Sequence, residues 1–182
     1  MRKALFFIVL FSYIIPAISQ NIIKEEKGYS SNIGILVSML DDLKKRITST
    51  VGNLDQNATD FLLDENANTI GAMIYHLAAT EKYYQVYTFE ERNFNTAEEK
   101  EWGVAMNLGD KGRQVLKGKP MEYYLAIWDD VRKDTKKLLK TKDDAWLKER
   151  RAGMNYHWAW YHVMEHQANH MGQIRMITKR VE

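Results

Sequence analysis

Residues 33–51 read IGILVSMLDDLKKRITSTV, and their apolar side chains recur at steps of three and four. That spacing places them on one face of an α-helix whose opposite face is polar. The next residue, Gly52, is a typical helix end. The apolar positions that define this face are Ile33, Leu36, Leu40, Leu43, Ile47 and Val51.

Three further segments show the same spacing, and two of them have a clear start signal. Asn68 or Thr69 can cap the first of these helices. Pro120 suits the first turn of the next helix, because no backbone N–H is needed there. Four long helices in one chain of 182 residues predict an all-α fold, an up-down four-helix bundle with irregular connections. The three further ranges are about 69–89, 120–138 and 156–179.

The connections between these helices are predicted to be irregular. Residues 53–67 are rich in Asn and Asp and predict a loop. In the stretch 90–119, residues 96–99 read TAEE, which is the capping-box pattern and predicts a short helix to about Met106. Three glycines then predict a loosened chain before the third long helix.

The first nineteen residues form a separate segment. Arg2 and Lys3 precede an apolar run over residues 4–15, and the small residues Ala17 and Ser19 follow, which is the layout of a secretory signal. We expect cleavage after Ser19, export to the periplasm or medium, and no stable membrane insertion afterwards; an uncleaved anchor is the alternative. The apolar run is shorter than the roughly 20 residues that a membrane span needs. The predicted organisation is a signal peptide (1–19), a short lead-in (20–28) and one helical domain (29–182).

Composition excludes several classes of function. The chain has no Cys, so it has no disulfide, no thiolate metal site and no cysteine nucleophile. Two of the 26 basic residues lie in the predicted signal, which leaves 24 bases against 24 acids. A domain so close to neutral lacks the electrostatic footprint of a nucleic-acid-binding protein. Any metal site must therefore use His, Asp or Glu.

Three of the five histidines lie at steps of four on the predicted last helix: His162, His166 and His170. A pair at this spacing can bind one metal ion from one helix face, but the outer two lie about 12 Å apart along the axis. Spacing alone leaves open which pair is used. His76 lies on a facing predicted helix and can add a third imidazole. Three imidazoles would hold a divalent ion and leave open positions, typical of a catalytic or substrate-binding site; the alternative is a purely structural ladder.

A second motif overlaps these residues. Residues 162–166 read HVMEH and match H-x-x-E-H, the inverted zinc-peptidase pattern in which both histidines bind zinc and the Glu is the base. Those enzymes also need an acidic ligand further along the chain. Only Glu182 follows the motif here. A zinc peptidase is therefore an alternative function with an incomplete ligand set.

The segment HQANHMGQI, residues 166–174, resembles the H-x-x-x-H-x-G-Q-[IL] signature of the DinB-like superfamily, the damage-inducible and thiol-transferase four-helix proteins. Residues 69–77, TIGAMIYHL, followed by Glu81, are similar to the segment that carries the first metal ligand of that superfamily. The resemblance spans about residues 29–180. It implies an up-down four-helix bundle, often a homodimer, with a histidine triad on a divalent metal. The ligands implied by position are His76, His166 and His170.

The resemblance also implies metal-dependent transfer of low-molecular-weight thiols, or isomerase or hydrolase chemistry, on a small molecule. Zinc is the expected ion for an exported protein, with Ni, Fe or Mn as alternatives. Two features depart from the pattern: Met171 stands where Arg is usual, and export separates the chain from cytosolic thiols. A non-catalytic exported module that binds metal or another ligand is the second class of function.

Side chains near these histidines supply further candidates. Glu81 is a candidate general base or ligand-orienting carboxylate, and Gln173 is the second catalytic candidate. We expect His162, Tyr83 and Trp158 to support the ligands or to line a pocket beside them. Each has a structural alternative, because buried carboxylates can be structural and aromatic residues at helical spacing are usually core.

Overall fold

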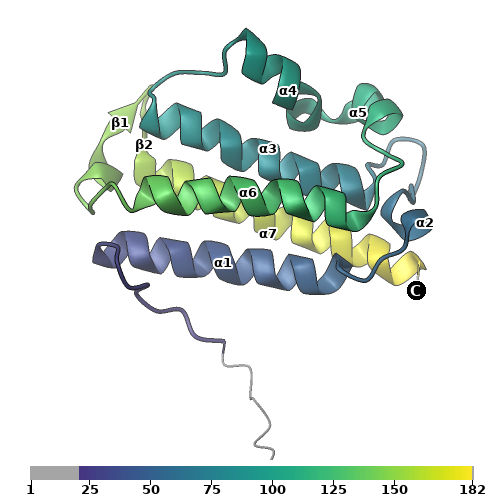
Figure 1. Ribbon diagram of the computed structural model, residues 1–182, viewed down its shortest axis with the longest axis horizontal. Helices are drawn as coiled ribbons and strands as arrows, with labels where there is room; N and C mark the ends of the chain where they lie inside the picture. The colour runs from purple at the N-terminus through teal and green to yellow at the C-terminus, as the bar shows by residue number, and fades with distance from the viewer. Residues whose placement is uncertain (1–20, 182) are drawn as a thin grey trace, which may run out of the picture.

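The computed structural model describes residues 21–181, so the predicted signal peptide lies outside the described residues. Within that range the elements are α1 (Ser31–Val51), α2 (Gln56–Thr59), α3 (Ile70–Phe89), α4 (Thr96–Asn107), α5 (Gly109–Val115), α6 (Met121–Leu139), the 3-10 helix η1 (Trp146–Lys148), β1 (Arg150–Arg151), β2 (Met154–Asn155) and α7 (Tyr156–Val181). The long helices α1, α3, α6 and α7 lie side by side, with α4 and α5 outside them (Figure 1). The all-α prediction is confirmed. No helix in the described part of the chain has an apolar stretch long enough to cross a bilayer.

The ends of the long helices follow the predicted signals. α1 ends at Val51, directly before Gly52. The Thr69 side chain accepts a hydrogen bond from the Ala72 backbone N–H at 3.1 Å and so caps α3. Pro120 lies immediately before α6. These signals act over a few residues, which is why the sequence predicts them well.

The capping box of α4 lies one residue earlier than residues 96–99. Asn95 is the N-cap, and its side-chain oxygen accepts from the backbone N–H groups of Ala97 and Glu98. The Glu98 carboxylate reaches back to the Asn95 N–H at 2.8 Å. Asn caps a helix as well as Thr does, so the sequence allows an N-cap at Asn95 or at Thr96. The structure has the N-cap at Asn95.

Two short helices form where irregular chain was predicted. α2 lies within the predicted loop 53–67, and α5 follows directly after α4. The corner between α4 and α5 has positive φ at Leu108 (51°) and Gly109 (65°). The glycines after α4 therefore turn the chain but do not unfold it.

Two apolar clusters fill the space between the long helices. One contains Ile74 and Trp128, and the other contains Leu36 and Trp160, all almost fully buried. Burial of such large apolar side chains is the main force that holds the helices together. A layer of buried polar residues from α3, α6 and α7 separates the two clusters along the helices.

The N-terminus of α1 is capped from a distant part of the chain. The side chain of its N-cap residue, Ser30, makes no cap bond to the helix, and its hydroxyl donates to Asp144 instead. Asp144 also accepts the backbone N–H groups of Asn32 at 3.0 Å and Ile33 at 3.2 Å. A carboxylate at this position satisfies free amides and complements the helix dipole.

The lead-in before α1 packs against that helix. A Cβ at Gly34 would lie 2.9 Å from the Glu26 backbone nitrogen, so only glycine allows the lead-in to approach this closely. The Lys24 N–H donates to the Ser38 hydroxyl at 3.2 Å. The segment predicted as a polar lead-in therefore lies on the helical domain.

Candidate metal centre

Three histidines meet between α3 and α7. The Nε2 atoms of His76 and His166 lie 2.9 Å apart, and those of His166 and His170 lie 3.1 Å apart. One ring nitrogen from each of the three residues lies within 4.8 Å of the others. No fourth His, Asp or Glu of residues 21–181 joins this group.

The helices explain why these rings meet. His166 and His170 are one turn apart on α7, so both side chains project from the same helix face. His76 lies on α3, which packs against α7. Of the two pairs that spacing left open, the structure brings His166 together with His170.

Hydrogen bonds at the outer ring nitrogens orient two of the imidazoles. The His76 Nδ1 lies 2.8 Å from the carbonyl oxygen of Ala105 on α4, and a carbonyl can only accept. The His170 Nδ1 lies 2.8 Å from the Gln173 Oε1. Both rings therefore carry their proton on Nδ1 and turn an Nε2 lone pair toward His166.

The centre of the cluster has more lone pairs than protons. The His166 Nε2 can donate at most one proton, so it cannot satisfy both His76 and His170. A divalent cation held by the three lone pairs removes this conflict, and metal–nitrogen distances of about 2.0–2.1 Å put ligand nitrogens on the order of 3 Å apart. The donor set therefore fits a metal ion. The His166 Nδ1 is buried and has no hydrogen-bond partner in the described part of the chain.

The environment keeps these imidazoles neutral. Burial lowers the pKa of His166 to about 3, and repulsion from His170 and His76 adds to the effect. Burial, with the nearby His76, lowers the pKa of His170 to about 4. Burial also lowers the pKa of His76, against the opposing effect of its hydrogen bond to Ala105. Neutral imidazole is the form that binds metal ions.

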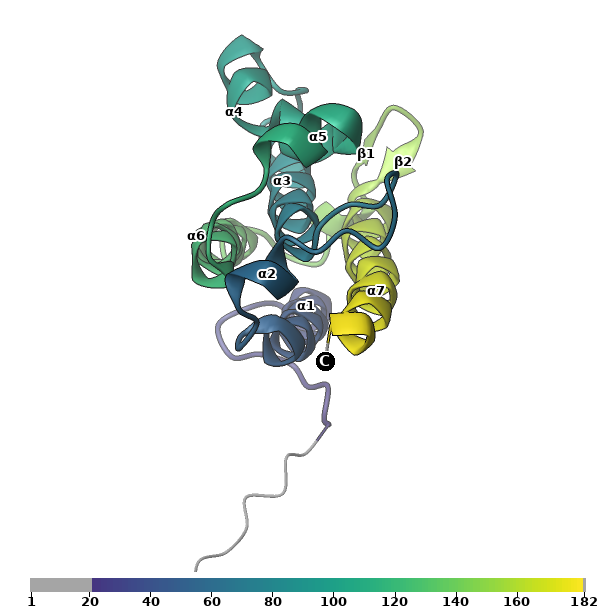
Figure 2. The same cartoon turned by 90° about the vertical axis from the view of Figure 1, so that its right-hand side faces the viewer.

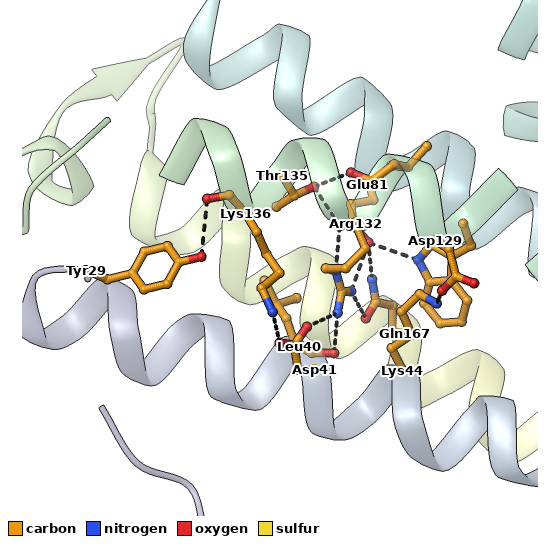
Figure 3. A network of polar contacts seen from close by, with 12 residues as sticks. Tyr29, Leu40, Asp41, Lys44, Glu81, Asp129, Arg132, Thr135, Lys136 and Gln167 are labelled. Carbon is orange, nitrogen blue, oxygen red and sulfur yellow. Dashed lines mark hydrogen bonds and ion pairs between the residues drawn. The ribbon is translucent and has the colours of Figure 1, made fainter. Parts of the chain in front are cut away.

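Only one of the two catalytic candidates touches this cluster. Gln173 bonds directly to His170. Glu81 instead lies fully buried against Arg132, with its Oε1 2.7 Å from the Arg132 Nε and its Oε2 2.9 Å from an Arg132 terminal nitrogen (Figure 3). The other donors to the Glu81 carboxylate are Trp128, Thr135 and Gln167.

Both oxygens of the Glu81 carboxylate accept hydrogen bonds from this buried network. None of its five hydrogen bonds within the described residues goes to an imidazole. Burial pushes the pKa of Glu81 upward, but the Arg132 charge and the hydrogen bonds outweigh it and leave the pKa below its ordinary value. Glu81, expected as a base or orienting carboxylate at the metal, therefore lies in this buried network and not among the three histidines.

His162 lies outside the three-histidine group. Its ring stacks on Trp158, with centroids 5.1 Å apart and planes 6° from parallel. Its Nδ1 lies 3.2 Å from the Glu165 carboxylate. Its ring centroid is 6.2 Å from that of His166. The pairing that an H-x-x-E-H zinc site needs is therefore not formed.

Tyr83 belongs to an aromatic cluster beside His162. Its ring lies 5.6 Å from that of Tyr84, and the Tyr84 ring lies 5.9 Å from His162. The Tyr83 hydroxyl donates to Asn93 at 3.2 Å. Tyr83 therefore reaches the histidine region only through its neighbours, while Trp158 is about half exposed.

Two functional contacts were missed from the sequence. The Ala105 carbonyl orients His76, and a backbone oxygen leaves no side-chain signature. Arg132 was not singled out as the partner of Glu81, although it stands four residues after Trp128 on the buried face of α6. A charge on an apolar helix face is the signal that could have identified it.

The model of the mycothiol-S-transferase family matches residues 35–181, which include all three clustered histidines. The chain belongs to this family. Mycothiol-S-transferases are part of the DinB-like superfamily, so the resemblance seen in the sequence is confirmed. No curated protein is similar enough to match the chain. The mycothiol-S-transferase family indicates a thiol-transferase-like function, a small-molecule substrate and dependence on a metal.

Proposed function

We propose that this protein is an exported, metal-dependent transferase that joins a low-molecular-weight thiol to a small-molecule acceptor. The thiol sulfur forms a bond to an electrophilic carbon of the acceptor, the leaving group departs with the electrons of the broken bond, and the thiol proton passes to solvent. The observation that carries the proposal is the convergence of three neutral imidazoles, with no fourth protein ligand among residues 21–181. His76, His166 and His170 are the metal ligands in this proposal, and zinc is the expected ion. Three protein ligands leave a position for an exogenous group, as in catalytic zinc sites.

A bound divalent ion supplies a charge that lowers the pKa of a thiol in the open position, so that a thiolate nucleophile is available near neutral pH. The three imidazoles contribute no charge of their own, so they do not neutralise that effect. The Ala105 carbonyl and Gln173 hold the outer nitrogens of two rings, which keeps the Nε2 atoms facing one another.

The proposal includes the wider organisation of the chain. The side-by-side long helices support an up-down four-helix bundle over residues 29–182. A cleaved signal over residues 1–19 accounts for the charged start and the apolar run. The superfamily resemblance also supports a homodimer. Mycothiol, the thiol in the family name, is the first cosubstrate to test.

The test uses the mature protein, beginning at Gln20. Metal content is measured on the purified protein, and loss of free thiol is then followed with mycothiol, cysteine and glutathione against an alkyl halide acceptor. We expect thiol loss that requires metal and disappears in His170→Ala. One metal per chain without transfer of any thiol would favour the non-catalytic binding module instead.

A further inference from the structure

A cavity of about 200 Å³ lies about one helical turn from the candidate metal centre; none of the three histidines lines it, but Gln173, which bonds His170, does. Its walls come from the loop before α3, the first turn of α3 and the last turns of α7. Figure 2 shows this loop passing close to the C-terminal half of α7. The cavity is therefore built where three separate parts of the chain meet.

Two side chains connect the cavity to the histidines. Met73 lines it three residues before His76, and Gln173 lines it three residues after His170. The Gln173 Oε1 receives the Nδ1 proton of His170, so the same amide touches both the cavity and a candidate ligand. Gln173 is exposed, and no hydrogen bond within residues 21–181 uses its amide nitrogen, so that nitrogen can donate to water or to a bound molecule.

Asn68 provides the complementary acceptor. Its Oδ1 is buried and makes no hydrogen bond within residues 21–181, although the residue lines the cavity. Buried polar atoms are nearly always paired, so this oxygen needs a donor that the described chain does not supply. The oxygen is covered in this structure, so the O–H or N–H group of a bound molecule reaches it once the Asn68 side chain turns toward the cavity.

The remaining walls are apolar. Met73 and Ile177 are buried within the cavity, while Leu63 (39% exposed) and Met176 (49% exposed) lie at its rim. Exposed apolar side chains around a hollow are typical of a ligand site. A cavity of about 150 Å³ accepts benzene, so this one is large enough for a single substituted ring.

We propose that the cavity binds the acceptor substrate of the transfer, and that this acceptor carries one small apolar or aromatic group with a hydroxyl or N–H substituent. The substituent donates to the Asn68 Oδ1 and can accept from the Gln173 amide nitrogen. The apolar group lies among Met73, Met176 and Ile177. The inference rests on the proposed function, because it names the second substrate of that reaction.

The first test observes the cavity directly, without activity. Metal-loaded mature protein labelled at the methionine methyl groups is titrated with benzyl alcohol and with toluene, and the NMR signals are assigned by single Met→Leu variants. The Met73 and Met176 signals should shift, and the signal of Met39 on α1 should not. Asn68→Leu should weaken benzyl alcohol binding about threefold to tenfold, the size of one net hydrogen bond, without weakening toluene. Unmoved Met73 and Met176 signals, or equal benzyl alcohol affinity in Asn68→Leu, would overturn the proposal.

The second test uses activity. Ala67→Phe places a ring in the cavity, so it should raise KM for a benzyl halide at least tenfold relative to a methyl halide, with metal content unchanged. An unchanged KM ratio would overturn the assignment of this cavity to the acceptor. If no thiol is transferred to any acceptor, the proposed function fails, and the methyl NMR titration still decides whether the cavity is a binding site.

Discussion

Two polar clusters share α3, the histidine cluster between α3 and α7 and the Glu81 network between α3, α6 and α7, and they differ in how their hydrogen bonds are completed. Glu81 in the buried network receives five hydrogen bonds and faces the Arg132 charge. The histidine cluster, only five residues away on α3, directs lone pairs at one another and leaves the His166 Nδ1 without a partner in the described chain. A polar cluster that its own residues complete holds the fold together. One whose lone pairs face one another has the donor set of a metal site.

The strongest test of the structural cluster removes one charge. Arg132→Leu should lower the free energy of unfolding by about 3–5 kcal/mol, because it leaves the Glu81 carboxylate buried without its partner. Chemical denaturation of the metal-free protein measures this. The double variant Glu81→Leu with Arg132→Leu should recover part of the loss. A single variant within about 1 kcal/mol of the parent would contradict the assignment.

The histidine cluster should respond to metal. Bound metal should stabilise the fold by about 2.7 kcal/mol at a hundredfold excess over Kd, so Tm should fall with chelator and recover with zinc. His76→Ala and His170→Ala should each lose most of the metal, whereas His162→Ala should keep one metal per chain. Metal analysis measures this, and circular dichroism confirms that each variant is folded. Metal lost from His162→Ala but kept by the other two would restore the H-x-x-E-H reading.

Gln167 couples the Glu81 network to the helix that carries His166 and His170, so a change in the network should alter metal binding. Gln167 follows His166 on α7 and donates to Glu81 at 3.1 Å, so it fixes the rotation of α7 relative to α3. Gln167→Leu should weaken metal binding about tenfold, at the low end of effects seen for residues that orient ligands. Gln85→Leu is the matched control, because Gln85 is equally buried but its amide nitrogen donates only to α6 residues, and its oxygen accepts from Lys82 on α3. Equal zinc affinities in the two variants would show that the clusters are independent.

The smallest effect is expected at α4, which carries the Ala105 carbonyl. Hydrogen bonds from Arg92 lower the pKa of Glu98 to about 2. A carboxyl whose folded pKa is below its unfolded value stabilises the fold above the unfolded pKa, and this contribution is lost as pH falls toward the folded value. Glu98→Gln should therefore cost less than about 1 kcal/mol at neutral pH, because the pair is near the surface. The difference from the parent should vanish near pH 2 in denaturation series, and a constant difference would argue against this pKa.

Local signals made most of the fold predictable, and their limits explain what was missed. The β1–β2 hairpin turns at Ala152 and Gly153, with φ of 50° and 85°. A two-residue turn of this kind usually shows Asn-Gly or Asp-Gly, so an Ala in the left-handed region hid the hairpin. The corner between α4 and α5 was not predicted for the same reason, because its positive φ falls on Leu108, a residue type that does not signal a turn.

The candidate site was predictable only in part, because its decisive contacts are long-range. Helical spacing gave two possible histidine pairs, and only the superfamily resemblance favoured His166 with His170. The structure adds the physical reason, since His162 is stacked on Trp158. The placement of Glu81 depends on Arg132, which lies 51 residues away, and no local sequence pattern predicts such a pairing.

The cap that Asp144 provides for α1 means that the first long helix to be synthesised is completed by a residue that is synthesised much later. α1 leaves the ribosome first among the long helices, yet its first amides wait for a carboxylate 112 residues later. A nascent chain that stops short of Asp144 therefore holds a helix with an unfinished end. The first turn of α1 is therefore fully capped only after nearly the whole chain has been synthesised and Asp144 has packed against it.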